Sequence, residues 1–307
     1  RKVTFGGDAL LNDIRHRFNG ILNGIDFEIW NPKTDRFLAA NYDILDGIDA
    51  VVEAKQKNKE FLKSLFAKEG DIPALDIKAS ERYGRFAHAE HRPLIGVVSR
   101  LVSQKGIDSI VQMLLDIRAG RKQGHAFDLI ILGHGEKGLE DELTGLAAQF
   151  PEASIVYVKA FAESLAHLIY AGADMLLMPS DYEPGGITQM VAMRYGAIPV
   201  VRKTGGLADT VFESGSRQTG FVFEGVSRAF ASPQEDAVRK QINTDQLYEA
   251  ILRAMGIYAA DPKDWQRIIT NAMQADNSWD RSLGDYKNVY AQLTRELAEA
   301  HNAAGTA

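Results

Sequence analysis

Residues 174–201, with the sequence DMLLMPSDYEPGGITQMVAMRYGAIPVV, contain the pattern on which the fold depends. Two short apolar runs, at 174–178 and 198–201, flank a helical pattern at 187–195. Neither run alternates apolar with polar residues, which is typical of strands buried on both faces of a parallel sheet. The segment therefore predicts a strand–helix–strand unit with a right-handed crossover.

The same alternation extends to both sides of this unit. Further strand-like runs occur at 94–98, 127–132, 154–158 and 220–223. Helical patterns lie between the runs at 107–122, 136–149, 163–172 and 206–213. Repeated strand–helix units predict an α/β fold with a doubly wound, mostly parallel, Rossmann-like sheet. Ligands of such sheets bind beyond the carboxyl ends of the strands, so functional residues are expected there.

The flanking segments do not follow this alternation. Before Pro93, the patterns predict a turn at 23–26, a charged helix at 55–68 and a strand-poor connection at 82–92. A weakly patterned loop follows Gly225 and extends to about Asn243. Helices are then predicted at 244–260, 262–274 and 279–299. We therefore expect three parts: the end of an N-terminal domain or linker at 1–92, the Rossmann-like domain at 93–275, and a C-terminal helix and tail at 276–307.

The composition argues against several classes of protein. The 307 residues carry 35 Lys and Arg against 41 Asp and Glu, and this net charge of −6 argues against a broad nucleic-acid-binding surface. The sequence has no cysteine, which excludes disulfides, thiolate catalysis and cysteine-based metal sites. No apolar run approaches the ~18 residues of a membrane helix. We expect neither nucleic acid nor a membrane as a partner.

Two cations follow the strand at 94–98. Arg100 and Lys105 lie in the segment that leads into the next helix, and both could face one anion at the edge of the sheet. Arginine offers a rigid fork to phosphate oxygens, and lysine a mobile point charge. Spacing alone favours the plainer alternative, in which both are solvated surface side chains.

A second candidate segment follows the strand at 174–178. Glu183 precedes two glycines, Gly185 and Gly186, at the start of a helical pattern. Glycines let a ligand approach the backbone closely, and free N–H groups with the helix dipole favour an anion. Glu183 could accept hydrogen bonds from sugar hydroxyls, and Thr188 could donate one to a phosphate. The alternative is an ordinary helix start, but this context favours a binding role.

Two weaker signals follow other strands. Gly205 and Gly206 repeat the glycine pair after the strand at 198–201, where a plain connection is as well supported as a binding loop. Phe161 could stack on a nucleobase, although a lone aromatic residue is more often part of the core. His134 is interpreted as a loop residue. None of the seven histidines pairs at metal-ligand spacing, so no metal site is predicted.

Four stretches together resemble bacterial glycogen synthases and plant starch synthases. They are residues 20–26 with 30–32, 99–106, 183–190 and 194–211, of which the last, RYGAIPVVRKTGGLADTV, is long and specific. The resemblance implies the donor-binding half of a retaining glycosyltransferase with two Rossmann-like domains, the GT-B fold. Such enzymes move glucose from ADP-glucose to the non-reducing end of an α-1,4-glucan, with no metal or other cofactor. It implies a cytoplasmic location in a bacterium, or the plastid in a plant.

The resemblance also implies residue roles. Arg100 and Lys105 would hold the diphosphate, where fixed cations stabilise the charge of the leaving group. Glu183 would hold glucose hydroxyls, and we expect these three residues to carry catalysis. Further donor contacts are implied for Asn23 with the glucose, Phe161 with adenine, Gly185, Gly186, Ile187 and Thr188 with the diphosphate, and Gly205, Gly206 and Leu207 with the diphosphate and sugar pocket.

The sequence departs from the family pattern in two ways. Gly185 stands where the family usually has cysteine, which removes one packing group. The N-terminal half of the family, with its acceptor contacts, is missing. We therefore interpret the chain as the nucleotide-sugar half of a synthase. Alone, it is expected to bind ADP or ADP-glucose weakly and to transfer glucose poorly or not at all. Its exposed interdomain face would favour the missing domain or self-association.

Two other interpretations remain open from the residues. One is a non-catalytic module that binds adenine nucleotide or glucan. The other is a retaining transferase that uses a different nucleotide-sugar donor, because nothing in the composition identifies a base.

Overall fold

The computed structural model describes residues 19–86, 92–123, 127–150, 154–227 and 232–305. The chain divides into two compact units. The larger spans residues 28–275, and the smaller combines the described residues of 1–27 and 276–307. This division does not test the predicted domain boundaries at 92 and 275, which stay a prediction.

The larger unit is built on one seven-stranded sheet with the order β1-β4-β3-β2-β5-β6-β7. Its strands are β1 (Arg82–Tyr83), β2 (Leu94–Val98), β3 (Asp128–Leu132), β4 (Ser154–Val158), β5 (Met175–Met178), β6 (Ile198–Arg202) and β7 (Phe221–Phe223). All neighbouring pairs are parallel except β1 with β4, and β2 to β6 are almost completely buried where described. The prediction of a doubly wound, mostly parallel sheet is confirmed.

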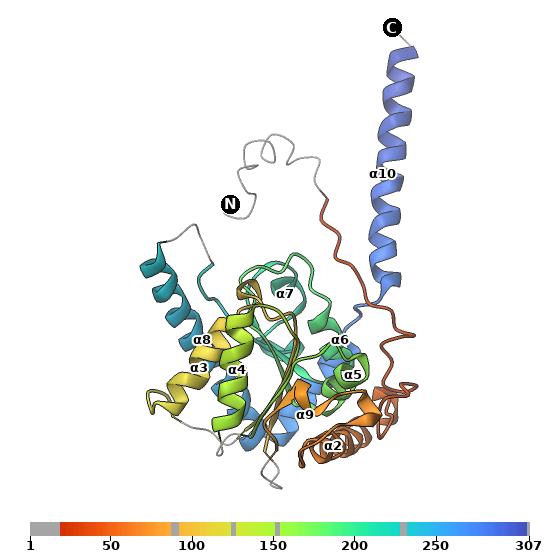
Figure 1. Ribbon diagram of the computed structural model, residues 1–307. Coiled ribbons are helices and arrows are strands. Elements are labelled where there is room, and N and C mark those ends of the chain that lie inside the picture. The colour runs from red at the N-terminus through yellow and green to blue at the C-terminus, as the bar shows by residue number, and fades with distance from the viewer. Residues whose placement is uncertain (1–18, 87–91, 124–126, 151–153, 228–231, 306–307) are drawn as a thin grey trace. The chain divides into compact units, whose positions relative to one another are not determined.

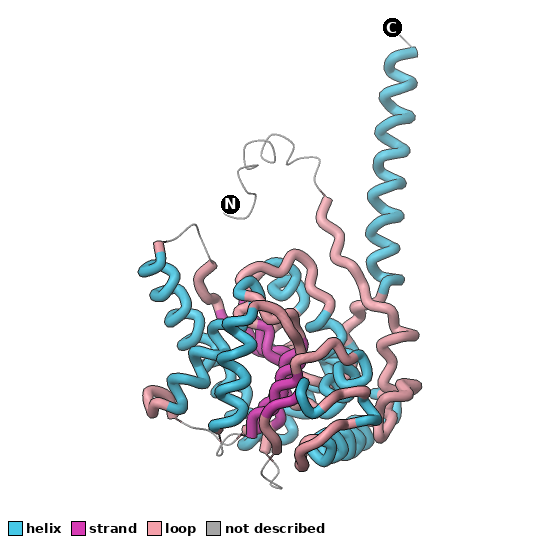
Figure 2. The backbone as a smooth tube through the Cα atoms, in the orientation of Figure 1, coloured by secondary structure: helices cyan, strands magenta, loops and turns pink. Residues whose placement is uncertain are grey.

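Helices cover both faces of the sheet (Figures 1 and 2). On one face, α3 (Ile107–Arg118) packs against α4 (Lys137–Gln149) and α8 (Pro233–Ala260). On the other, α5 (Glu163–Gly172) packs against α2 (Ile48–Leu65), and α6 (Thr188–Arg194) packs against α9 (Pro262–Gln274). The short α7 (Gly205–Thr210) follows β6. Helices therefore exclude solvent from both faces of the strands, as the uninterrupted apolar runs predict.

The structure corrects three predicted segments. The helix expected at 55–68 is α2, which begins at Ile48 and ends at Leu65. The connection expected at 82–92 contains the short edge strand β1, which pairs antiparallel with β4. The loop expected to reach Asn243 is interrupted much earlier, because α8 begins at Pro233. Ser232 and Glu235 form a capping box at its start, a signal that was present in the sequence.

Helix α2 is fixed to the amino ends of the strands by three lysines, one on each successive turn. Lys59 pairs with Asp174, which precedes β5, at 2.7 Å, and Lys63 pairs with Asp128, the first residue of β3, at 2.6 Å. Lys55 is buried and donates to the carbonyl oxygens of Ala171, Ala173 and Tyr195 at 3.0–3.1 Å. These contacts lie at the opposite edge of the sheet from the carboxyl ends, which leaves that edge for the site.

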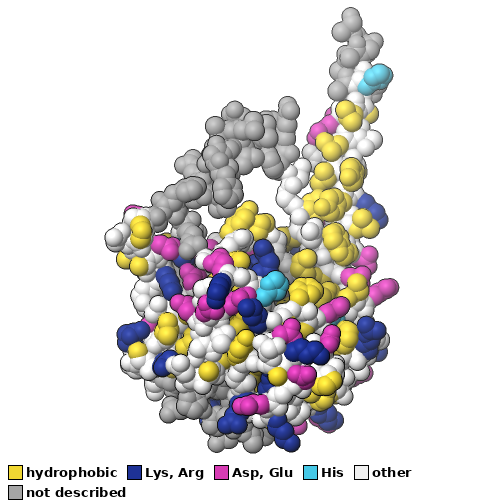
Figure 3. All heavy atoms as spheres, in the orientation of Figure 1, with side chains coloured by type: hydrophobic (Ala, Val, Ile, Leu, Met, Phe, Trp, Pro, Cys, Tyr) yellow, Lys and Arg dark blue, Asp and Glu magenta, His cyan; other side chains and the backbone are white. Residues whose placement is uncertain are grey.

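The smaller unit contains α10 (Trp279–Gly305) and the segment before residue 28. Ile25 N–H donates to Asn277 O at 2.8 Å, and the Ser282 hydroxyl donates to Leu22 O at 2.7 Å. Hydrophobic side chains line α10 (Figure 3), and the exposed ones are Trp279, Leu283, Tyr286, Tyr290, Leu293 and Leu297. On the face of the larger unit seen in Figure 3, acidic and basic side chains are interspersed.

Candidate ligand-binding site at the carboxyl edge of the sheet

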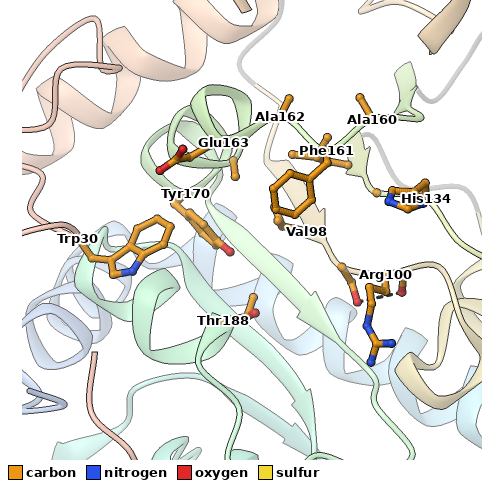
Figure 4. A pocket seen from close by; sticks show the side chains of 14 residues that line it. Trp30, Val98, Arg100, His134, Ala160, Phe161, Ala162, Glu163, Tyr170 and Thr188 are labelled. Atoms are coloured by element: carbon orange, nitrogen blue, oxygen red, sulfur yellow. Dashed lines mark hydrogen bonds between the residues drawn. The ribbon is translucent and has the colours of Figure 1, made fainter. Parts of the chain in front are cut away.

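A cavity of about 480 Å³ lies at the carboxyl ends of β2, β3 and β4 and beside α5. Figure 4 shows Phe161 and Arg100 on one side of it and Trp30 with Tyr170 on the other. Thr188, at the start of α6, lies at one end, and its side chain is hydrogen-bonded to Tyr170. The cavity thus combines aromatic walls with a guanidinium group and a hydroxyl group.

Phe161 is the most exposed large apolar side chain in this region, with 93% of its surface accessible. It lies three residues after the end of β4, and its ring borders the cavity rather than the core. An exposed ring beside a cavity can stack on a flat ligand group, since aromatic faces attract one another with offset geometry. Its predicted contact with adenine stays a prediction.

The loop that carries Arg100 and Lys105 packs directly on the loop that carries Glu183. Gln104 donates its side-chain amide to Tyr182 O at 3.1 Å and accepts from Asp181 N–H at 2.8 Å. Gly106 permits this approach, because a Cβ on it would lie 2.1 Å from Pro179 O. Two loops that are about 80 residues apart in sequence are therefore held as one surface.

This packing brings Lys105 and Glu183 together. The Lys105 ammonium donates to the Glu183 carboxylate, and Ser180 donates to the same oxygen at 3.3 Å. Both side chains are mostly covered, with 22% of Lys105 and 15% of Glu183 exposed. Arg100 is exposed at the rim of the large cavity. The two predicted cations therefore lie in one loop. The positive charge of Lys105 is balanced by its ion pair with Glu183.

The two glycine turns also meet. Gly206 N–H donates to Glu183 O at 3.0 Å and to Pro184 O at 3.2 Å. A Cβ on Gly206 would lie 1.7 Å from Gly185 O, so only glycine allows the approach. At Gly185 itself a Cβ would meet nothing within 4 Å, which leaves open space where the family usually has cysteine. From the sequence, a plain connection and a binding loop were equally well supported for Gly205 and Gly206. In the structure this segment packs against the turn at 183–186 and supports it.

The other residues that were predicted to contact the nucleotide-sugar donor lie in different parts of the structure. Lys105, Glu183, Gly186 and Thr188 border a second, small cavity of about 20 Å³. Ile187 is half exposed beside them. The Leu207 side chain is buried in the core, so only its backbone can contribute to a site. Asn23 is exposed and belongs to the smaller unit, so the structure does not place it beside these residues.

Sequence reasoning missed the buried charges that hold the Glu183 loop. Arg239, on α8, donates to both carboxylate oxygens of Asp181 at 2.9 and 3.1 Å and to Asp108 at 3.1 Å. Arg202, at the end of β6, donates to Asp181 O at 2.8 Å. No local motif indicates these contacts, because the residues that make them are far apart along the chain. They fix the loop because an unpaired buried charge is costly.

Sequence reasoning also missed the group that positions Trp30. The Trp30 ring stacks on His167 with 4.4 Å between ring centroids and an interplanar angle of 18°. Asp35 Oδ2 lies 2.6 Å from His167 Nδ1 and accepts from the Tyr195 hydroxyl at 2.6 Å. Burial raises the pKa of Asp35, but these hydrogen bonds outweigh burial and hold the pKa below its usual range. The carboxylate form therefore anchors one wall of the cavity.

Two further features are absent from the described ranges. These residues contain no group of three or more His, Asp or Glu side chains that could hold a metal ion. In the same ranges, every helix is too short or too polar to cross a membrane.

The mostly parallel sheet, which has cations, a carboxylate and glycine turns at its carboxyl edge, matches the GT-B glycosyltransferase fold. A family model described as "Glycosyl transferases group 1" matches residues 81–251, and the chain belongs to this family.

Two relatives and one solved structure show which kinds of glycosyltransferase the chain is similar to. The chain is 40% identical over 297 residues to a glycogen synthase of Rhodospirillum rubrum, covering 95% of this chain and 52% of that protein. It is 38% identical to a glycogen synthase of a Hydrogenobaculum species, and the match covers 97% of this chain and 54% of that protein. The catalytic domain of starch synthase IV from Arabidopsis thaliana bound to ADP and acarbose matches with a TM-score of 0.71 and 32% identity, covering 94% and 51%. The chain spans about half the length of the relatives it matches, and the predicted resemblance is confirmed.

Proposed function

We propose that this chain forms the donor-binding side of an α-glucan synthase. The enzyme would transfer glucose from ADP-glucose to the non-reducing end of an α-1,4-glucan, with retention at the anomeric carbon. The observation that carries the proposal is the convergence of Arg100, Lys105 and Glu183 with the glycine turns beside a cavity bordered by Phe161. The similarity to glycogen synthases and to a starch synthase bound to ADP supports it.

The proposed chemistry depends on charge at the diphosphate. Arg100 and Lys105 would bind its oxygens, and the Gly186 and Ile187 N–H groups would donate to it. As the bond to glucose breaks, negative charge grows on the departing ADP, and fixed donors stabilise it without reorganising. We propose that these groups serve in place of a metal ion.

Glu183 and the aromatic wall would orient the other parts of the donor. The Glu183 carboxylate would accept hydrogen bonds from glucose hydroxyls once the diphosphate draws Lys105 away from it. Phe161 would stack on the adenine, and the glucan acceptor would approach the glucose from outside this group of donor-binding residues. Asn23, Gly205, Gly206 and Leu207 are proposed as further donor contacts on the family resemblance.

A calorimetric titration with ADP, with UDP in parallel, tests the proposal. We expect saturable binding of ADP, weaker binding of UDP, and loss of ADP binding in Arg100→Ala and Lys105→Ala. Lys57→Ala, which removes an exposed lysine from α2, serves as the control and should bind normally. Absence of ADP binding by the folded chain would refute the proposal, and preference for UDP would indicate a transferase with another donor.

A further inference from the structure

Gln189, in the first turn of α6, is fully buried beneath the first glycine turn and takes no part in the proposed function above. Its Nε2 lies 3.2 Å from Gly185 O, 3.1 Å from Gly186 O and 3.1 Å from the hydroxyl oxygen of Thr210. Thr210 in turn donates to Gly206 O at 2.6 Å. A single buried amide therefore joins both glycine turns.

Donors and acceptors fix the orientation of this amide. Thr210 has one hydroxyl hydrogen and commits it to Gly206 O, so its oxygen accepts from Gln189. Two carbonyl oxygens beside it also need donors, and only the NH₂ end of the amide can serve all three, by sharing its two hydrogens. A carboxylate in the same place would bring its oxygens close to these acceptor oxygens and would have no hydrogen to donate to them.

This contact decides which way the turn presents its N–H groups. In a trans peptide unit, C=O and N–H point in opposite directions, and the chain has no cis peptide in its described residues. Gly185 O and Gly186 O point to the buried amide. The N–H groups of the same two units, on Gly186 and Ile187, therefore point to the exposed side. Across the described residues, neither N–H has an acceptor.

The turn would not hold this orientation by itself. Gly186 has φ +67°, and two successive glycines have many accessible backbone conformations. A binding site gains affinity when its donors are ordered before the ligand arrives, because less entropy is lost on binding. The buried amide supplies this order from below the turn.

We propose that Gln189 is a positioning residue that turns the N–H groups of Gly186 and Ile187 toward the diphosphate of a bound nucleotide. It acts through the backbone of the turn, does not touch the ligand, and is supported by Thr210. The inference rests on the proposed function, since it needs a diphosphate at this turn.

Matched substitutions in the 307-residue chain test the role of Gln189. Gln189→Glu replaces the NH₂ by an oxygen at nearly constant shape, and Gln234→Glu makes the same change at an exposed position on α8. Binding of ADP and of adenosine, which lacks the phosphates, is measured for each. We expect Gln189→Glu to bind ADP at least about tenfold more weakly, as for lost charge-assisted hydrogen bonds. Its adenosine binding and the ADP binding of Gln234→Glu should stay near the wild type.

Thr210 gives a second comparison in case Gln189→Glu does not fold, which thermal unfolding will show. Thr210→Val removes the hydroxyl and should weaken ADP binding, whereas Thr210→Ser keeps the hydroxyl and should restore it. If folded variants at both positions bind ADP as the wild type does, or lose ADP and adenosine equally, the positioning role is refuted while the proposed function stands. If the wild type itself fails to bind ADP, the proposed function is refuted, and this inference with it.

Discussion

The ion pair between Lys105 and Glu183 leads to a prediction about the charges at the diphosphate site. The carboxylate is mostly covered and borders the same small cavity as Gly186. We therefore expect it to lie near the position proposed for the diphosphate. In the wild type Lys105 neutralises it. We predict that Lys105→Met weakens ADP binding, and that adding Glu183→Gln to this variant restores part of the loss.

The magnitudes follow from the contacts. Lys105→Met removes one charge-assisted hydrogen bond to the ligand, worth about 1.5–3 kcal/mol, which corresponds to roughly 10- to 150-fold weaker binding. It also removes the cation that pairs with the Glu183 carboxylate, to which Ser180 still donates a hydrogen bond. Like charges separated by several ångströms near a protein surface repel by about 1–3 kcal/mol. Removing that charge should therefore recover about 5- to 150-fold in affinity.

The assay is calorimetric titration with ADP at constant ionic strength, because exposed charges are screened by salt. Lys57→Met with Glu53→Gln repeats both changes in an exposed ion pair on α2 and should leave ADP binding unchanged. If Glu183→Gln leaves the affinity of Lys105→Met unchanged or lowers it further, the carboxylate does not face the diphosphate and the reasoning is wrong.

Three further predictions concern other parts of the larger unit. Phe161→Ala should weaken ADP binding by about 1–3 kcal/mol without changing the thermal unfolding temperature, because the ring is 93% exposed; titration and melting of the same samples check this. Gly206→Ala should lose both stability and ADP binding, because its Cβ would lie 1.7 Å from Gly185 O, whereas Gly185→Ala should be tolerated; equal behaviour of the two variants would contradict the packing described. Burial lowers the pKa of Lys55 from 10.5 to about 7, so between these values the unfolded state binds more protons, and the free energy of unfolding should rise with pH by up to about 1.4 kcal/mol per unit. Lys55→Met should lack this rise, and parallel stability curves in urea from about pH 7 to 9 would argue against the lowered pKa.

Local sequence patterns predicted the sheet strands closely, apart from β1. The apolar run at 94–98 coincides with β2, and the runs at 154–158 and 198–201 agree with β4 and β6 within a residue. These strands are buried on both faces, so their residues must be apolar irrespective of which strand lies beside them. The two-residue β1 has no such pattern, because an edge strand is formed by pairing with β4 rather than by burial.

The site was predictable to the extent that it lies at strand ends. Arg100, Glu183 and the glycines were found because parallel strands place their carboxyl ends at one edge of the sheet. Residues 30–32 contributed to the family resemblance, but no local pattern indicated that Trp30 reaches this cavity. Its ring stacks on His167, which lies on α5 and is more than 100 residues further along the chain.

The sequence by itself determined the parallel α/β class, the loops that carry the candidate site and the family resemblance, because these depend on periodicity and on contiguous motifs. Only the tertiary structure decided that Lys105 is paired with Glu183, that Gly206 supports the turn at Gly185, and that Gln189 lies beneath it. Each of these contacts depends on how close two backbones or side chains come after helices and strands have packed. That distance is set by the side chains between them across the whole core, and no local pattern contains it.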